Sequence, residues 1–396
     1  MIGTAMSLSS ESQVAESFPQ SKCEIDYTIL FLGCQPSREN ARKTQLLWEW
    51  SARRLMETLP QAIKLHDVAE AAGVSIATAS RALGGKKRVS RETAKIVLEA
   101  AERLGYRVDP IARALREGST RTVGMVVPII GNPHFAELIA AIEDELQAFG
   151  LELIISDSHA EVQQQAKRLR TLVDRRVDGI LLVSHDAKKS VPAIRESMRA
   201  APVVQIDRKV NGVKCDFVGI DDDPAMRLIL DHLVEQGVHR VVLTSADDLN
   251  SVGRARREAF ERHVSELGLT SDPHIIDNFS VEAGRDAADE LLRRGDLPDA
   301  IVAGSDMNAV GVIARLRERG VDVPDQVLVT GFDGTQLSEI YNPPITTVRQ
   351  PVGSLARNAV AFLLSRIADP TEPARDSRIA TELVVRASTD GRALKS

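Results

Sequence analysis

The sequence predicts an α/β protein in which a helix-turn-helix headpiece precedes a larger body of two lobes, each a parallel sheet flanked by helices. Three observations predict this arrangement. The chain has 396 residues, which suits two or three domains better than one. Residues 61–108 carry the pattern of three short capped helices. From residue 121 onward, short apolar strands alternate with helices.

Composition excludes several classes of protein. Hydrophobic residues make up 43% and charged residues 27% of the chain, which excludes global disorder. No apolar run is long enough to span a membrane, and Met1–Ser10 hold no Lys or Arg to begin a secretory signal. Cys23, Cys34 and Cys215 are spaced too widely for a disulfide framework or a zinc site. We therefore expect a cytoplasmic protein with no metal and no cofactor.

Charge is distributed unevenly along the chain. Residues 61–120 have a net charge of +4, whereas residues 1–60 have −1 and residues 121–396 have −9. A small basic unit before an acidic body indicates a polyanionic partner for the first part only.

Residues 1–60 are interpreted as an extension, because residues 1–55 show no helix or strand pattern of useful length. Three interpretations remain open for them. They are a disordered extension, a small accessory helix, or upstream sequence translated from a wrongly chosen start. We favour the third, with Met56 as the true start.

The headpiece, residues 61–108, is predicted from its capping residues. Helices are expected at Asp67–Ala72, Ile76–Leu83 and Arg91–Leu104, with Ser75 and Ser90 as N-caps and Gly73 and Gly105 as terminators. The first two helices have helix-turn-helix spacing. At 100° per residue, Ile76, Ala77, Ser80 and Arg81 share an arc of about 140°, and Ala79 and Ala82 lie opposite, toward the packing partner.

This exposed arc suits a DNA groove. Arginine is the commonest bidentate partner of guanine, which favours Arg81 as a base contact. Ser75 and Thr78 could donate to phosphates, and the loop cations Lys86, Lys87 and Arg88 could hold them. The alternative is a helical hairpin used for protein contacts, with Arg81 solvated.

Residues 109–120 are predicted to be a short hinge helix and linker, with Asp109 as its cap and Pro110 at its first position. Leu115, flanked by Arg113 and Arg116, could wedge into a minor-groove base step. The alternative is a linker leucine packed on the body.

Residues 121–396 are expected to form the larger body. Its strands are nearly unbroken apolar runs, which predicts parallel sheets buried on both faces. They are Thr122–Val127, Leu151–Ser156, Gly179–Val183, Val203–Asp207, Phe217–Ile220, Arg240–Thr244, Ala300–Ala303 and Val327–Gly331. Helices are expected at Phe135–Phe149, Ala160–Arg175, Pro224–Gln236, Ala255–Leu267 and Asn308–Arg319. The predicted first lobe spans about 121–221 and 347–370, and the second about 222–346 and 371–392.

Together these segments resemble the LacI/GalR family of bacterial transcription regulators. The resemblance covers about residues 63–392. The matching motifs are Leu65–Ser75, Thr78–Leu83, Val89–Thr93, Leu104–Arg107, Ala112–Arg116, Gly131–Glu137, Arg176–Ile180, Gly331–Gly334 and Pro343–Pro351. Three departures stand out: Lys64 at the cap of the first helix, Val108-Asp109 before the hinge helix, and Ile76-Ala77 at the main base-reading positions.

The resemblance implies a body like that of the periplasmic sugar-binding proteins, with a small effector between the lobes. Hydroxyl-rich ligands suit fixed Arg and Asp partners and aromatic ring faces. The implied effector residues are His134, Phe135, Asp207, Arg208, Asn250, Arg254, Arg256, Phe279 and Asp306. The implied DNA contacts are Ser75, Ile76, Ala77, Thr78, Ser80, Arg81, Lys86, Arg88, Tyr106, Ala112 and Leu115. For each effector residue the alternative is a surface charge or a core aromatic.

The function implied by this resemblance is that of a repressor controlled by a small effector, a sugar or a polyol. Two subunits would present their headpieces to a near-palindromic operator, at the nucleoid in the cytoplasm. No leucine-heptad tail follows Arg392, which favours a homodimer over a tetramer. A sugar-transport component is disfavoured by the headpiece. An enzyme is disfavoured because no G-x-G-x-x-G, P-loop or catalytic cluster has a recognisable setting.

Overall fold

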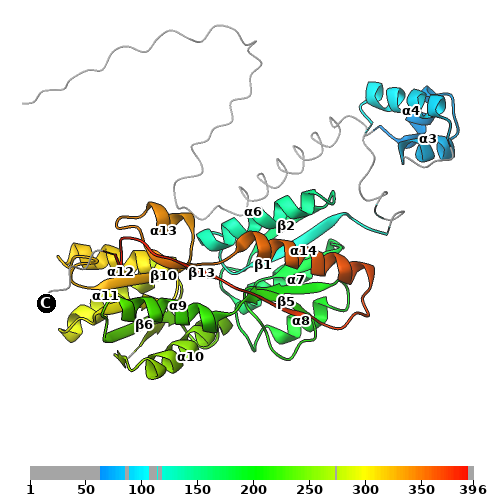
Figure 1. Cartoon of the computed structure of the whole chain (residues 1–396). Helices are drawn as coiled ribbons and strands as arrows, with labels where there is room; N and C mark the ends of the chain where they lie inside the picture. The colour runs from blue at the N-terminus through cyan, green and yellow to red at the C-terminus, as the bar shows by residue number, and fades with distance from the viewer. Residues whose placement is uncertain (1–62, 85–88, 107–113, 115–117, 273, 391–396) are drawn as a thin grey trace, which may run out of the picture. The chain divides into compact units, whose positions relative to one another are not determined.

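The structure is a computed structural model that describes residues 63–84, 89–106, 114, 118–272 and 274–390 (Figure 1). The chain divides between Arg107 and Val108 into two compact units, the headpiece and the body. Among the described residues, no helix is both long enough and apolar enough to cross a membrane.

The headpiece consists of helices α2 (Leu65–Ala71), α3 (Ile76–Leu83) and α4 (Arg91–Leu104). The predicted caps are confirmed. Ser75 Oγ accepts a hydrogen bond from the Thr78 N–H (3.2 Å), and Ser90 Oγ accepts one from the Thr93 N–H (3.1 Å). Gly73 and Gly105 adopt left-handed φ values of 63° and 66°, which glycine tolerates best.

Helix α2 differs from its predicted bounds, because it begins at Leu65 and not at Asp67. Asp67 lies inside the first turn, where its carboxylate accepts a hydrogen bond from the Lys64 N–H (2.8 Å). A lysine side chain has no acceptor, so Lys64 cannot cap the helix through its side chain, and Asp67 makes only the reciprocal bond, to the N–H of the N-cap residue.

The first lobe of the body is a six-stranded parallel sheet in the order β12-β5-β4-β3-β1-β2. Its strands are β1 (Thr122–Val127), β2 (Glu152–Asp157), β3 (Gly179–Leu182), β4 (Val203–Ile206), β5 (Asp216–Ile220) and β12 (Asp376–Ile379). Its helices are α6 (Pro133–Gln147), α7 (Val162–Asp174), α8 (Val191–Ser197) and α14 (Val352–Ala368). Helices α6 and α14 pack together on one face, and α7 packs against both α8 and β1 (Figure 1).

The second lobe is a larger sheet in the order β13-β11-β10-β9-β6-β7, with β8 also paired to β6. Every pairing is parallel except that of β11 with β13. The strands are β6 (Arg240–Ala246), β7 (Thr270–Ser271), β8 (Ile275–Asp277), β9 (Ala300–Ala303), β10 (Leu328–Asp333), β11 (Thr346–Arg349) and β13 (Glu382–Val384). The helices are α9 (Asp222–Glu235), α10 (Ser251–Glu266), α11 (Val281–Arg294), α12 (Asp306–Glu318) and α13 (Gln336–Ile340).

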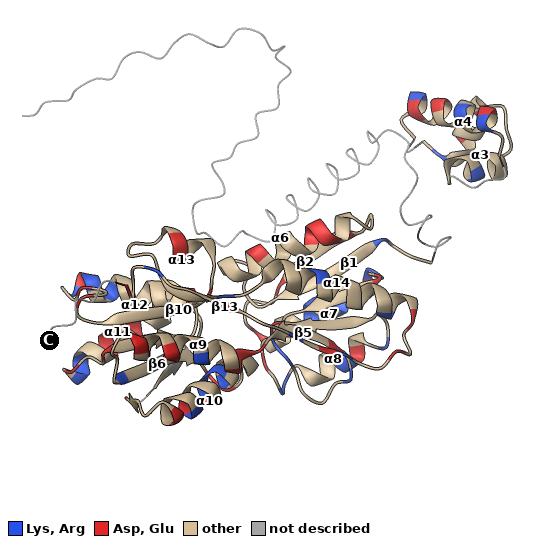
Figure 2. Ribbon diagram, in the orientation of Figure 1, with Lys and Arg blue, Asp and Glu red and all other residues tan. Residues whose placement is uncertain are grey.

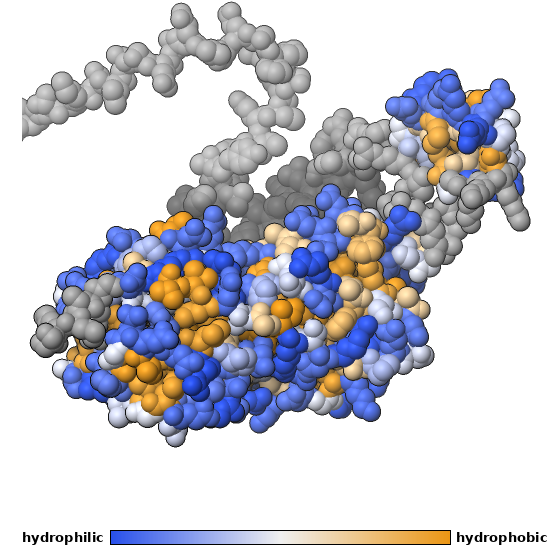
Figure 3. All heavy atoms as spheres, in the orientation of Figure 1, coloured by the Kyte–Doolittle hydropathy of each residue, from blue (hydrophilic) through white to orange (hydrophobic). Residues whose placement is uncertain are grey.

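The prediction of parallel sheets buried on both faces is confirmed. Strands β3, β4 and β9 are buried along their whole length, because helices cover both faces of each sheet. Charged side chains lie mainly on the helices and loops, while the central strands carry few (Figure 2). On the face drawn in Figure 3, apolar side chains reach the surface in patches among hydrophilic ones.

The predicted lobe boundaries need two corrections. Strand β11 pairs with β10, so residues 346–349 belong to the second lobe and the return to the first lobe begins at α14. Strand β12 pairs in parallel with β5, so residues 376–379 belong to the first lobe and not to the second. The chain therefore passes between the lobes three times: after β5, after β11 and after β12.

A polar network explains why residues 376–379 join the first lobe. Asp216, at the start of β5, is fully buried and accepts hydrogen bonds from the guanidinium groups of Arg366 and Arg375. Arg375 directly precedes β12 and also donates its backbone N–H to Asp216 (2.8 Å). This buried carboxylate therefore fixes the incoming chain beside β5.

Candidate functional site

Helix α3 presents the arc that its sequence predicts. Ala79 and Ala82 are buried in the headpiece core, whereas Ile76 is 49% exposed and Ala77 and Arg81 are exposed as well. Arg81 Nε donates to the Ala77 carbonyl (3.0 Å), and Arg81 makes no ion pair within the described residues. The guanidinium thus lies along the exposed face with its terminal N–H groups available to a partner.

The other predicted DNA contacts fall into two groups. Ser75 and Thr78 share a hydrogen bond between their hydroxyl groups (2.9 Å), and Ser80 is half-buried. Tyr106 is half-buried against the headpiece core. The remaining predicted contacts lie outside the described residues, as do the other loop and hinge positions named with them: Lys86, Lys87, Arg88, Asp109, Pro110, Ala112, Arg113, Leu115 and Arg116.

In the body, the predicted effector residues lie where strands end. His134 and Phe135 follow β1, Asp207 and Arg208 follow β4, and Phe279 follows β8. Asn250, Arg254 and Arg256 follow β6, and Asp306 follows β9. Ligands of open parallel sheets bind at the carboxyl ends of the strands, so this is the edge at which a cleft between the lobes is expected.

On the first-lobe side, the buried residues His134, Asp207 and Arg208 form one cluster. Asp207 Oδ1 lies 3.5 Å from His134 Nε2, and Asp207 Oδ2 lies 3.6 Å from Arg208 Nε. The guanidinium carbon of Arg208 lies 5.5 Å from the ring centroid of Phe135. Asp207 has a φ of 63°, a strained value for a non-glycine residue, and its carboxylate lies between His134 and Arg208.

The pKa values of this cluster reflect burial opposed by charge. Burial acts to lower the pKa of His134, but the carboxylates of Asp207 and Asp333 outweigh it and raise that pKa. Burial acts to raise the pKa of Asp207, but His134, Arg208 and Arg256 together lower it. Because burial penalises charge, these neighbouring charges are what offsets its effect on the pKa values of His134 and Asp207.

On the second-lobe side, Arg256 is the central residue and is only 2% exposed. Its Nε donates to Asp222 Oδ1 (3.0 Å), and its Nη1 donates to the Gly304 carbonyl and lies 3.7 Å from Asp333 Oδ1. Its guanidinium carbon lies 3.5 Å from the Phe332 ring centroid and 5.6 Å from that of Phe279. Helix α10 begins at Ser251, four residues earlier than predicted, so Arg256 lies in its second turn.

Asp306 makes its contacts within the second lobe. Its Oδ2 accepts from the N–H and the hydroxyl of Thr335 (both 2.8 Å), and its Oδ1 accepts from the Thr347 hydroxyl (2.7 Å). Burial and the neighbouring Asp333 raise the pKa of Asp306 to about 7. Both carboxylate oxygens of Asp306 are therefore hydrogen-bonded to the segments around α13 and β11. An effector contact of Asp306 stays a prediction.

Four residues that the sequence analysis did not select also reach this cluster. Asp222 and Asp333 pair with Arg256, while Ser245 Oγ and Gln350 Oε1 are buried without a hydrogen-bond partner among the described residues. His134 Nδ1 and Arg208 Nε are buried and lack hydrogen bonds in the same way. All four stand at the end of a strand or within two residues of it, a signal that the sequence offered.

Asn250 and Arg254 lie at the start of α10. Asn250 caps the helix, accepting from the Val252 N–H (3.0 Å), which explains its burial. The Arg254 side chain is 30% exposed and its nearest carboxylate, that of Glu258, is 3.9 Å away.

Three hydrogen bonds join the lobes around the cluster: Ala187 N–H to the Leu249 carbonyl (2.9 Å), Lys209 N–H to Ser251 Oγ (3.1 Å) and Gln336 N–H to Glu137 Oε1 (3.0 Å).

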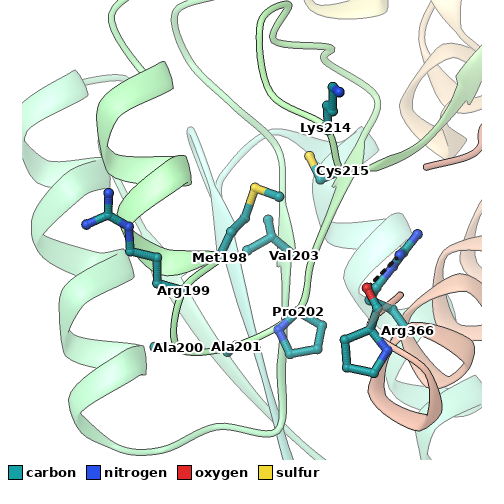
Figure 4. A pocket seen from close by; sticks show the side chains of 10 residues that line it. Met198, Arg199, Ala200, Ala201, Pro202, Val203, Lys214, Cys215 and Arg366 are labelled. Atoms are coloured by element: carbon teal, nitrogen blue, oxygen red, sulfur yellow. Dashed lines mark hydrogen bonds between the residues drawn. The ribbon is translucent and has the colours of Figure 1, made fainter. Parts of the chain in front are cut away.

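A separate pocket of about 280 Å³ lies at the amino ends of β4 and β5, away from this edge (Figure 4). Met198, Val203 and Cys215 line it, and none of the predicted effector residues does. Burial raises the pKa of the Cys215 thiol to about 11, so the thiol is protonated near neutral pH.

The chain combines a helix-turn-helix headpiece with two parallel-sheet lobes, and a buried polar cluster lies where the two lobes meet. This combination defines a class of protein: transcriptional regulators that bind DNA and a small ligand. The model for bacterial regulatory proteins of the lacI family matches residues 64–109. That for a periplasmic binding protein-like domain matches residues 230–389.

Known proteins are similar to this chain, in sequence or in structure, over most of its length. HTH-type transcriptional repressors PurR of Aliivibrio salmonicida and Aliivibrio fischeri are 30% and 31% identical, covering 82% and 83% of this chain and 98% of each relative. The Lac repressor dimer bound to operator has a TM-score of 0.76 at 22% identity, covering 83% of this chain and 99% of that one. The regulator CelR in complex with cellobiose has a TM-score of 0.63 at 26% identity, covering 82% and 99%. The chain belongs to the LacI family; it is a DNA-binding transcriptional regulator and not an enzyme.

Proposed function

We propose that this protein is a homodimeric repressor of a near-palindromic operator, whose DNA affinity is set by a small polyhydroxylated effector bound between the lobes. The observation that carries the proposal is the buried polar cluster around Arg208 and Arg256, where both lobes contribute unpaired donors and acceptors.

In the headpiece, the exposed arc of α3 enters the major groove. Arg81 supplies the hydrogen-bonding base contact, and Ile76 and Ala77 make apolar contact with thymine methyl groups. Phosphate and sugar contacts position the headpiece; they come from Ser75, Thr78, Ser80, Tyr106, Lys86 and Arg88. The minor groove is entered by Ala112 and Leu115. Such binding would place the protein at the nucleoid.

A sugar or polyol fits the chemistry of the cleft. Its hydroxyl groups both donate and accept, as the mixture of Asp207, Arg208 and Ser245 requires, and Phe135 and Phe279 can cover the apolar faces of a ring. Among family members of known structure, CelR is bound to cellobiose and a regulator from Enterococcus faecium (27% identity, TM-score 0.60) is bound to ribose.

Effector and operator are coupled through the lobes. The cleft residues come from both lobes, so a ligand that bridges them favours one lobe arrangement over another. By linkage, the operator must change effector affinity by the same factor that the effector changes operator affinity, typically about 5- to 150-fold. The sign of the effect distinguishes an inducer from a corepressor.

The test begins with selection of an operator from random duplexes by the full-length protein. Fluorescence anisotropy then measures operator affinity in the presence of sugars, polyols and nucleosides. At least one compound that stabilises the protein in a thermal shift should change the operator Kd. If stabilising compounds leave that Kd unchanged, the allosteric coupling is wrong, and if no duplex is selected, operator recognition fails.

A further inference from the structure

Besides the pocket at Cys215, the body contains a hollow near the expected effector site. We call this hollow the outer subsite. It measures about 400 Å³ and is lined by Ala187, Lys188, Val191, Pro192, Asn211 and Arg254. All but Arg254 come from the first lobe, and Arg254 comes from α10 of the second. A molecule held here therefore contacts both lobes.

The outer subsite adjoins the cleft. Arg254 stands two residues before Arg256 on α10. Lys209, which follows Arg208, donates its N–H to Ser251 Oγ at the start of that helix (3.1 Å). The Ala187 N–H to Leu249 carbonyl bond closes the same side. A ligand that extended from Arg208 toward the start of α10 would meet the outer subsite.

The outer subsite is cationic. Lys188 and Arg254 line it, and no acidic residue does. Lys188 has no ion pair among the described residues, and Arg254 has only the distant Glu258. The adjacent carboxylate, Asp186, is already bound by the backbone N–H groups of Lys188 (2.8 Å) and Lys189 (2.7 Å). The apolar side chains that line the outer subsite beside Lys188 and Arg254 are those of Ala187, Val191 and Pro192.

The cleft itself has the opposite character. Its carboxyl groups are those of Asp207, Asp222, Asp306 and Asp333, set against His134 and the guanidinium groups of Arg208 and Arg256. An anion placed among four buried carboxyl groups gains no net attraction, whereas hydroxyl groups bind there without charge repulsion. The cleft therefore suits a neutral, hydroxyl-rich part of a ligand, and the outer subsite suits an anionic part.

We propose that the outer subsite binds the anionic group of a carbohydrate effector, a phosphate or a carboxylate, while the sugar hydroxyls occupy the cleft. This inference rests on the proposed function and narrows its effector class to charged carbohydrates. Lys188 and Arg254 bind the anion from opposite lobes, so the charged group itself helps to hold the lobes together.

The test compares matched probes on the full-length protein by thermal shift and calorimetry. Glucose, fructose and mannose are each paired with their 6-phosphates, and glucose and galactose with their uronates. For at least one pair we expect the charged member to bind about tenfold more tightly. Lys188→Gln should abolish that gain. Lys189→Gln, the matched control, should retain it, because Lys189 faces Asp186 and does not line the hollow.

The outcomes separate the two proposals. If an uncharged sugar binds and its charged counterpart gains nothing, or if the gain survives Lys188→Gln, the outer subsite is wrong while the cleft stands. If inorganic phosphate alone, at matched ionic strength, stabilises the protein as much as every sugar phosphate, the anion binds without the sugar and the proposal fails. If no carbohydrate of either kind binds, the effector class of the proposed function fails as well.

Discussion

Replacing Arg256 with methionine tests the role of the buried charges in the cleft. Methionine keeps much of the length and apolar volume of arginine but removes the guanidinium. Asp222 and Asp333, each 7% exposed, then lose their cationic partner. Breaking a buried ion pair costs about 3–5 kcal/mol, because a charge remains buried without compensation. For a body of this size, that loss corresponds to a fall in Tm of about 10 °C.

The loss should depend on pH in a defined direction. Burial raises the pKa of both Asp222 and Asp333 in the folded protein, although Arg256 acts to lower each. Without Arg256 both pKa values rise further. A carboxyl group whose folded pKa exceeds its unfolded value favours the folded state at low pH, and this advantage is lost as pH rises through the folded pKa. The variant should therefore lose less stability at pH 5 than at pH 8.

Urea unfolding followed by circular dichroism at both pH values measures the effect. Arg257→Met is the matched control, since Arg257 adjoins Arg256 on α10 but pairs with Asp248 and Glu261 near the surface. It should lose under about 1 kcal/mol at either pH. A loss for Arg256→Met that is as small as the control's, or that does not shrink at pH 5, would refute the assignment of Arg256 as the essential partner of these carboxylates.

Three further predictions concern DNA binding and helix packing. Arg81→Ala should weaken binding to the selected operator by about 1–3 kcal/mol and relax base preference at one position, measured by anisotropy; an equal loss on every duplex would make Arg81 a phosphate contact. Leu115→Ala should weaken specific binding far more than nonspecific binding, in the same assay, and equal losses contradict the wedge. Gly311→Ala should destabilise the second lobe by at least about 1–3 kcal/mol in urea unfolding, because an added Cβ would lie 2.0 Å from the Val281 carbonyl oxygen of α11. At Gly353 the nearest atom would be 3.5 Å away, so Gly353→Ala should cost nothing, and similar losses at both glycines would rule out the backbone clash.

Much of the fold was predictable because its signals are local. The caps of α3 and α4 depend on a serine and the N–H three residues later, so sequence spacing alone determines them. The eight predicted strands are all present, within one or two residues at most ends, because strands buried on both faces must be apolar along their length. Asp207 and Arg208 were placed correctly at the end of β4 for the same reason.

Elements at the edges of the sheets gave weaker signals. Strand β12 has the sequence Asp-Ser-Arg-Ile and β13 only three residues, so neither carries an apolar run. Their positions come from backbone pairing with β5 and β11 and from the Asp216 network, in which Asp216 lies 150 or more residues from both Arg366 and Arg375. Helix α14 was likewise not predicted, although three passages between the lobes were; the structure moves the boundaries of the second and third.

The sequence by itself determined the order of parts, the exposed arc of α3 and the position of most strand ends. These depend on spacing over a few residues and on the apolar character of each strand. Only the tertiary structure decided which charges meet there. Asp222 and Asp333 became partners of Arg256, and Asp306 became a brace for Thr335 and Thr347. The physical reason is that a buried charge is defined by the partner that compensates it, and that partner is supplied by a distant part of the chain.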